Sequence, residues 1–136
     1  LLKTLWIKNY DFKVFENIAL PLHVIGFQKD ELVDRVTESL EEIGLESKSE
    51  HFPDELSGGE QQRACVARAL VKDPDIILAD EPTGNLDPVT SFELIKLLEE
   101  INREGTTILM ASHNYNLIKG RGHRIIEIQN GIVRKS

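Results

Sequence analysis

The chain has 136 residues, of which 40% are hydrophobic and 29% charged, and this composition predicts one globular domain that needs no disulfide or structural metal. Its formal net charge of −7 argues against nucleic acid as the main partner, because binding to a phosphate backbone requires a basic surface. A single cysteine, Cys65, excludes an intrachain disulfide and indicates a reducing compartment. No signal peptide and no apolar run of membrane-spanning length is found, so we expect a cytoplasmic protein that reaches a membrane only through a partner.

The first part of the chain has a helical pattern from residue 14 to about residue 45. Leu32, Val36 and Leu40 recur at four-residue spacing, which places them on one face of a helix. Gly44 follows at the position of a C-terminal stop. These residues therefore predict a helical subdomain.

Other features of residues 1–55 are less regular. Pro21 interrupts the stretch 15–25, so this helix is predicted to be short or kinked. The apolar residues 5–7 could form the end of a strand. Twelve acidic and six basic residues occur in this part, and they form either a solvated helical face or a docking surface for a basic loop of a partner.

From residue 56 onward, helical patterns alternate with short apolar runs. A helix is predicted over 58–71, and the continuous apolar run 76–79 is typical of a strand that is buried on both faces of a parallel sheet. A helix over 88–103 ends near Gly105, and a second strand follows over 107–111. This order predicts a right-handed βαβ unit within a doubly wound α/β sheet.

Two smaller predictions complete the pattern. The segments 125–128 and 132–133, joined by Asn130 and Gly131, indicate a hairpin with a type I′ turn. Cys65 lies in an apolar helical stretch and is interpreted as a small core residue.

The most specific local pattern is the string LSGGEQQR at residues 56–63, directly before an Ala-rich helix. Ser57 can cap the helix, and Glu60, three residues later, completes a capping box. Gly58 and Gly59 lack side chains where backbone N–H groups would approach an anion closely, and the helix dipole favours negative charge at this end. The segment is therefore either a phosphate clamp or simply a well-capped helix after a tight turn.

Two acidic residues, Asp80 and Glu81, follow the strand 76–79. Ligands of open α/β sheets bind at the carboxyl ends of the strands, where a carboxylate can hold the Mg²⁺ of a nucleotide. Asp80 is the candidate for this role, and Glu81 could act on a water molecule as the general base. The alternative is that both are ordinary surface or helix-capping residues.

The turn-rich segment 82–87 and a histidine supply the remaining candidates. Asp87 is expected to cap a helix whose first residue is Pro88. His113 follows the strand 107–111, which places it on the same sheet edge as the two acids, where it could bind a γ-phosphate oxygen. A lone histidine at a strand end is also compatible with a structural role.

Taken together, these motifs carry a family resemblance. The string at 56–63, the string LADEPTGNLD at 78–87 and the pair Ser112 and His113 closely resemble the signature motif, Walker B, D-loop and H-loop of the ABC ATPases, in that order. The resemblance covers residues 14–136. It implies a P-loop NTPase fold of the α/β class, present in part.

The resemblance also implies a division of residues 1–136 and a branch of the family. Residues 14–55 would form the helical subdomain, and residues 56–136 the signature helix and the remainder of the parallel-sheet core. The segments 101–107 and 113–118 are most similar to the cell-division ATP-binding subunits of the FtsE type. The alternative branch contains the lipoprotein-release and macrolide-export ATPases, and the DNA- and ribosome-directed ABC ATPases form a more distant class.

The resemblance implies a mechanism in which two ATPase subunits, identical or different, enclose two ATP molecules with Mg²⁺. Asp80 would serve the metal, Glu81 the attacking water, and His113 the γ-phosphate. The residues implied to contact the ATP of the other subunit, or the dimer interface, are Ser57, Gly58, Gly59, Glu60, Gln61 and Asp87. The helical subdomain would face an integral membrane permease-like subunit, FtsX in the cell-division case, on the cytoplasmic face of the inner membrane.

The chain departs from the family pattern in two places. It contains no Gly-x-x-x-x-Gly-Lys-Ser/Thr string, so the P-loop is missing, and residues 1–13 contain no Q-loop glutamine. We therefore expect that the chain alone neither binds ATP tightly nor hydrolyses it. A fragment of an ordinary ATPase fits this pattern, and so does a short, catalytically incomplete module that donates only a signature loop.

Overall fold

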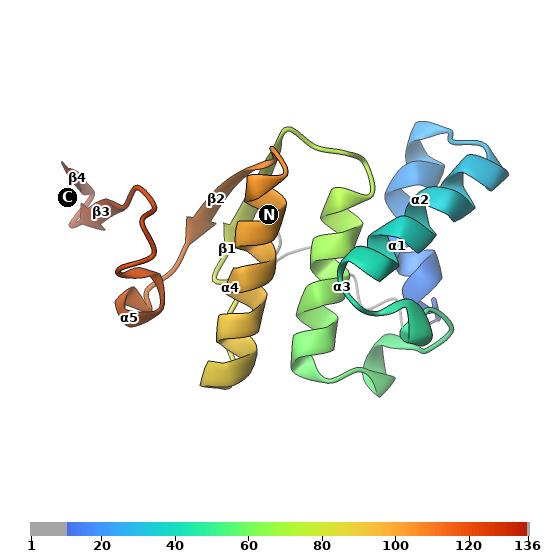
Figure 1. The fold of residues 1–136 in the computed structure, drawn as a ribbon, viewed down its shortest axis with the longest axis horizontal. Helices are drawn as coiled ribbons and strands as arrows, with labels where there is room; N and C mark the ends of the chain where they lie inside the picture. The colour runs from blue at the N-terminus through green and yellow to red at the C-terminus, as the bar shows by residue number, and fades with distance from the viewer. Residues whose placement is uncertain (1–10, 136) are drawn as a thin grey trace.

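The computed structural model describes residues 11–135, and Figure 1 shows helices at one end of the molecule and a hairpin at the other. The strand suggested for residues 5–7 lies outside the described residues. The elements in chain order are α1 (Val14–Ile25), α2 (Lys29–Glu42), the 3-10 turns η1 (Glu46–Lys48) and η2 (Pro53–Glu55), α3 (Gly58–Leu70), β1 (Ile76–Asp80), α4 (Pro88–Arg103), β2 (Thr107–Ala111), α5 (Tyr115–Ile118), β3 (Ile126–Gln129) and β4 (Ile132–Lys135).

Helices α1, α2 and α3 pack against one another and form most of the core (Figure 1). Leu32, Val36 and Leu40 are all buried on one face of α2, as their spacing predicts. Gly44 has a φ of 65° just beyond α2, a left-handed conformation that glycine adopts without a steric penalty. The predicted helical region and its stop are confirmed, although Gly26 divides the region into two helices.

Pro21 does not end α1 early, so the predicted short helix is wrong, while the alternative of a kinked helix stays a prediction. The helix continues through the proline for all 12 of its residues. A proline inside a helix removes one backbone hydrogen bond. Here the next residue, Leu22, is fully buried, as is Ile18 one turn earlier. Burial of these large side chains offsets the loss and keeps the last turn helical.

Strands β1 and β2 precede and follow α4 in the sequence, and they pair with each other in parallel, as predicted for a βαβ unit. Ile77 lies opposite Ile108, and Asp80 lies opposite Ala111. The prediction that β1 is buried on both faces is wrong for the described residues. Ile77 is buried against the helices, whereas Leu78 is 43% exposed. The reason is that the described helices cover only one face of this two-stranded sheet.

Strands β3 and β4 form the predicted hairpin, with Ile128 opposite Val133. Asn130 and Gly131 have φ values of 53° and 76°, so both central residues have the positive φ of a type I′ turn. Cys65 is only partly buried on α3, so it lies at the margin of the core and not inside it. Among residues 11–135, no helix is long and apolar enough to cross a membrane.

Candidate functional site

The capping box predicted at the start of α3 is present. The Ser57 hydroxyl accepts a hydrogen bond from the Glu60 backbone N–H at 3.3 Å, and the Ser57 N–H donates to the Glu60 carboxylate at 2.8 Å. These bonds satisfy two donors at the helix terminus. The bond from the Ser57 N–H also holds the pKa of the Glu60 carboxyl below its ordinary value. The string at 56–63 therefore presents a fixed helix N-terminus.

Gln61 has a structural role that sequence reasoning missed. Its side-chain amide donates to the carbonyl oxygens of Pro53 at 2.9 Å and Leu56 at 3.1 Å. It thereby ties the turn before the signature string to α3. The sequence holds no signal for this contact, because it depends on how the η2 turn folds back onto the helix.

The two glycines of the string lie against the start of α4. A Cβ atom on Gly59, which is buried, would lie 2.4 Å from the methyl carbon of Thr90, far inside contact distance. A Cβ on Gly58 would lie 3.4 Å from Leu86 Cδ2, an ordinary contact. The packing of α3 against α4 therefore requires glycine at position 59. From the sequence, this glycine was instead explained by the close approach of an anion to the backbone. Thr90 is a neighbour that the sequence analysis did not identify.

Asp87 caps α4 as predicted. One oxygen of its carboxylate accepts hydrogen bonds from the N–H groups of Val89 and Thr90, each at 3.0 Å, and the other accepts from the Thr90 hydroxyl. Pro88 occupies the first helical position, where its missing N–H costs nothing. The Thr90 hydroxyl contributes most to holding the pKa of Asp87 below its ordinary value, and the backbone donors add to it.

Glu81 and His113 meet at the carboxyl ends of the two parallel strands. The Glu81 N–H donates to the carbonyl of Ala111, the last residue of β2, at 2.9 Å, which extends the pairing one residue beyond the end of β1. Glu81 Oε1 accepts from the His113 backbone N–H at 2.8 Å and lies 2.8 Å from His113 Nδ1. The Glu81 side chain is 21% exposed and that of His113 is 85% exposed. The carboxylate is thus oriented by its neighbour, while the imidazole faces solvent.

The chemistry of this sheet edge fits a nucleotide-bound Mg²⁺. Asp80, the last residue of β1, is half-buried beside Glu81, so two oxygen-donor side chains adjoin the strand end. Magnesium in phosphate-binding sites is held by one or two carboxylates together with phosphate and water oxygens. Within the described part of the chain, no group of three or more His, Cys, Asp or Glu side chains is arranged to hold a metal. The two carboxylates at the strand end are donors of the kind that Mg²⁺ uses together with phosphate oxygens.

The predicted site residues thus fall into two neighbouring groups. One group lies where α3 and α4 begin, and the other lies at the ends of β1 and β2. The loop between β1 and α4 connects them, and it is held by hydrogen bonds from Gly84 N–H to the Glu81 carbonyl at 3.0 Å and from Leu86 N–H to the Thr83 carbonyl at 3.2 Å. The first group is Ser57, Gly58, Gly59, Glu60, Gln61 and Asp87, and the second is Asp80, Glu81 and His113.

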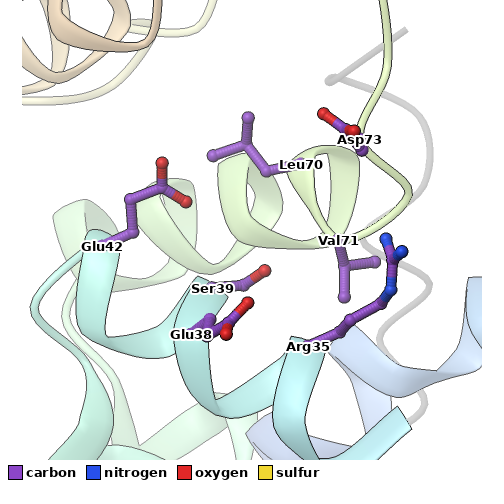
Figure 2. A pocket seen from close by; sticks show the side chains of 7 residues that line it. All are labelled: Arg35, Glu38, Ser39, Glu42, Leu70, Val71 and Asp73. Carbon is purple, nitrogen blue, oxygen red and sulfur yellow. The ribbon is translucent and has the colours of Figure 1, made fainter. Parts of the chain in front are cut away.

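A separate pocket lies between α2 and the C-terminal end of α3, as Figure 2 shows. Because α3 has 13 residues, this end is roughly 18 Å from the start of the helix at Gly58. Partial desolvation is the main cause of a raised pKa at Glu42, which is exposed, and the carboxylates of Glu104 and Glu38 add to the shift. The pocket therefore belongs to the packing of the helical part. It is lined by Arg35, Glu38, Ser39, Glu42, Leu70, Val71 and Asp73.

Comparison with known proteins identifies the family. Residues 7–84 match the family model described as ABC transporter. The cell-division ATP-binding protein FtsE of Bacillus subtilis (strain 168) is 52% identical over 120 residues, covering 88% of this chain and 53% of FtsE. FtsE of Streptococcus pneumoniae serotype 2 is 53% identical over 120 residues, covering 88% of this chain and 52% of FtsE.

A solved structure agrees with these matches. The dimeric structure of MJ0796, a bacterial ABC transporter cassette, superimposes with a TM-score of 0.77 at 38% identity, over 94% of this chain and 58% of that one. The chain spans about half the length of the curated relatives it matches. The family resemblance and the partial P-loop ATPase fold predicted from the motifs are confirmed. This chain belongs to the ABC transporter family of ATP-binding proteins, and it is similar to the cell-division protein FtsE.

Proposed function

We propose that this chain is part of an FtsE-like ATPase subunit that couples ATP hydrolysis to a membrane protein during cell division. The observation that carries the proposal is the pairing of Glu81 with His113 beside Asp80 at the carboxyl ends of β1 and β2. The strength of the similarity to FtsE proteins supports the cell-division branch over lipoprotein-release or macrolide-export ATPases.

In this proposal Asp80, Glu81 and His113, at the edge of the sheet, each have a separate role in ATP hydrolysis. Bound Mg²⁺ supplies positive charge to the phosphate oxygens, and Asp80 is the carboxylate that would hold it. Glu81 accepts a proton from the attacking water, and the hydrogen bond from the His113 N–H fixes the direction of its carboxylate. The exposed imidazole of His113 is placed to donate to a γ-phosphate oxygen.

The start of α3 would act on the ATP held by a second subunit. Ser57, Gly58 and Gly59 offer a hydroxyl and backbone N–H groups at a helix N-terminus, which is a favourable place for a phosphate. Glu60 and Gln61 support this segment through their bonds to Ser57 and to the preceding turn. The dimeric state named for the MJ0796 structure supports a homodimer or a dimer with a second ABC subunit.

The membrane partner would be an integral permease-like subunit of the FtsX type, with this protein peripheral on the cytoplasmic face of the inner membrane. The similarity to FtsE supports this assignment. Residues 14–55 are the proposed contact region. Their excess of acidic residues suits a partner loop with basic side chains.

The 136 residues alone are proposed to bind ATP weakly and to leave it unhydrolysed. They contain no Gly-x-x-x-x-Gly-Lys-Ser/Thr string, whose lysine and backbone N–H groups supply most of the phosphate contacts in P-loop proteins. Isothermal titration calorimetry with Mg-ATP is expected to show no binding at micromolar concentrations. A micromolar Kd would contradict this proposal.

The decisive experiment is ATP hydrolysis by the full-length protein with the substitution Glu81→Gln. The amide keeps the size of the side chain but accepts protons poorly, so kcat is expected to fall by about 100-fold or more. Glu93→Gln, at an exposed position of α4, is the matched control and should leave kcat unchanged. Equal kcat values for wild type and Glu81→Gln would refute the assignment of the base.

A further inference from the structure

Helices α3 and α4 begin side by side, and their first turns are in unusually close contact. The methyl carbon of Thr90 occupies space only 2.4 Å from where a Cβ atom would stand on Gly59. A Cβ on Gly58, the residue before Gly59, would lie at ordinary contact distance from Leu86. The backbone at Gly59 therefore approaches α4 as closely as only a glycine permits.

The Thr90 side chain is held in this position by Asp87. Its hydroxyl and its backbone N–H both donate to the Asp87 carboxylate. A threonine in a helix has two accessible χ1 rotamers, so its methyl could in principle turn away from α3. Such a rotation would carry the hydroxyl off the Asp87 carboxylate and break that bond. Asp87 thus fixes the rotamer, and the rotamer fixes the distance to Gly59.

The direction of the missing side chain separates two reasons for glycine at 59. A side chain added there would point at Thr90, into the buried contact between α3 and α4, and not toward solvent beyond the helix terminus. It would therefore collide with the first turn of α4. Gly58 is exposed and has only an ordinary contact, so the same argument does not apply to it.

We propose that Thr90 is a positioning residue, which holds residues 57–59 at the start of α3 against the D-loop residue Asp87. This packing is the reason that residue 59 is a glycine. The inference rests on the proposed function, because it assigns Thr90 an effect on the phosphate contacts of residues 57–59. Its structural part, the steric pairing of Gly59 with Thr90, stands independently of that function.

The test is a mutant cycle in the full-length protein, with thermal unfolding and steady-state ATP hydrolysis as readouts. Gly59→Ala alone is expected to lower Tm by about 4 °C or more, because a methyl group is forced into a filled space. It should also lower kcat by about tenfold or more, because the signature segment is displaced. Thr90→Ser removes the methyl that faces Gly59 but keeps the hydroxyl bond to Asp87, so it should lower both quantities, and by less than Gly59→Ala does.

The double variant Gly59→Ala/Thr90→Ser is expected to regain most of the lost Tm and most of the lost kcat. Alanine is also the better helix former, which favours recovery once the collision is gone. Gly59→Ala/Val89→Ala is the matched control, because Val89 is exposed on the adjacent position of α4, and it should recover neither.

The outcomes separate this inference from the proposed function. Recovery of both Tm and kcat in the double variant supports the positioning role of Thr90. An unchanged Tm for Gly59→Ala, or no recovery in the double variant, overturns the steric pairing. Recovery of Tm without kcat overturns the positioning role, because glycine would then be needed for contact with the nucleotide. If the wild-type protein hydrolyses no ATP, the proposed function fails while the unfolding data still decide the pairing.

Discussion

At the scale of single residues, the informative contact is the one between Glu81 and His113, which are 32 positions apart in sequence. Both the backbone N–H and the ring Nδ1 of His113 lie 2.8 Å from the same carboxylate oxygen. A carboxylate held in this way does not need to reorient before it accepts a proton, which is the advantage of a preorganised site. The ring and the backbone N–H of His113 therefore orient the Glu81 carboxylate through two separate contacts, and a substitution can remove the ring while the backbone contact stays.

Removing the ring alone should have a smaller effect than removing the carboxylate. In His113→Ala the backbone N–H still donates to Glu81, but the ring can no longer donate to a phosphate oxygen. Loss of one hydrogen bond to a charged group, about 1.5–3 kcal/mol, predicts a kcat roughly tenfold to a hundredfold lower in the full-length protein. His23→Ala, at an exposed position of α1, serves as the control. A kcat within twofold of wild type would contradict a role for the ring.

At the scale of elements, helix starts matter more than helix interiors for the proposed site. Ser57 and Asp87 cap α3 and α4, and each accepts hydrogen bonds from the backbone N–H groups of its own first turn. Because these caps hold the helix termini that carry the phosphate and dimer contacts of the proposal, damage to a cap should affect both stability and activity.

The substitution Ser57→Ala tests the cap on α3. It leaves the Glu60 N–H without its side-chain acceptor, and the free energy of unfolding is expected to fall by about 1 kcal/mol. Chemical denaturation followed by circular dichroism would measure this loss. Ser47→Ala, at an exposed position in η1, should change the free energy of unfolding by less than about 0.5 kcal/mol. Equal effects of the two substitutions would show that the cap does not stabilise the protein.

Local signals explain which elements could be predicted. The caps at Ser57 and Asp87 and the turn at Asn130 and Gly131 depend on residues within a few positions of each other, so the sequence was sufficient. That Glu81 and His113 lie close together could be predicted from the order of the strands, because parallel strands bring their carboxyl ends to one edge of the sheet. The contacts of Gln61 and Thr90 could not be predicted, since they depend on how closely separate elements pack. The roles of the site residues toward ATP stay predictions.

At the scale of the whole molecule, the described residues form a three-helix unit joined through α3 and α4 to a sheet that is covered on one face. Ile76, Leu78 and Leu109 are 52%, 43% and 57% exposed on the other face. The apolar run in β1 predicted that both faces of the strand are buried, and this prediction is wrong for the described residues. Hydrophobicity shows that a strand prefers to be buried, but it does not show which elements cover it. The chain spans about half of its relatives' length.

The contact between α2 and the end of α4 predicts a pH effect. Glu42 lies at the surface, where partial desolvation raises its pKa above the ordinary value of 4.5, and Glu104 and Glu38 add to the shift. Its contribution to stability is thus full below pH 4.5 and is lost as pH rises through the raised pKa. Glu42→Gln should therefore raise Tm at pH 7, and the difference should diminish toward pH 4. Differential scanning calorimetry would measure this, with the exposed Glu41→Gln as control. A lower Tm at pH 7 would contradict the prediction.

The backbone of Glu81 has a consequence for how this protein evolves. With a φ of 47°, the residue holds a left-handed conformation that costs a side-chain-bearing residue about 1–2 kcal/mol relative to glycine. Under selection for folding alone, drift at this position would favour glycine, at the expense of the only carboxylate paired with His113 in the described chain. If Glu81 is the base, as proposed, thermostability and turnover are under opposing selection at position 81, and a library screened only for heat resistance would accumulate inactive variants there.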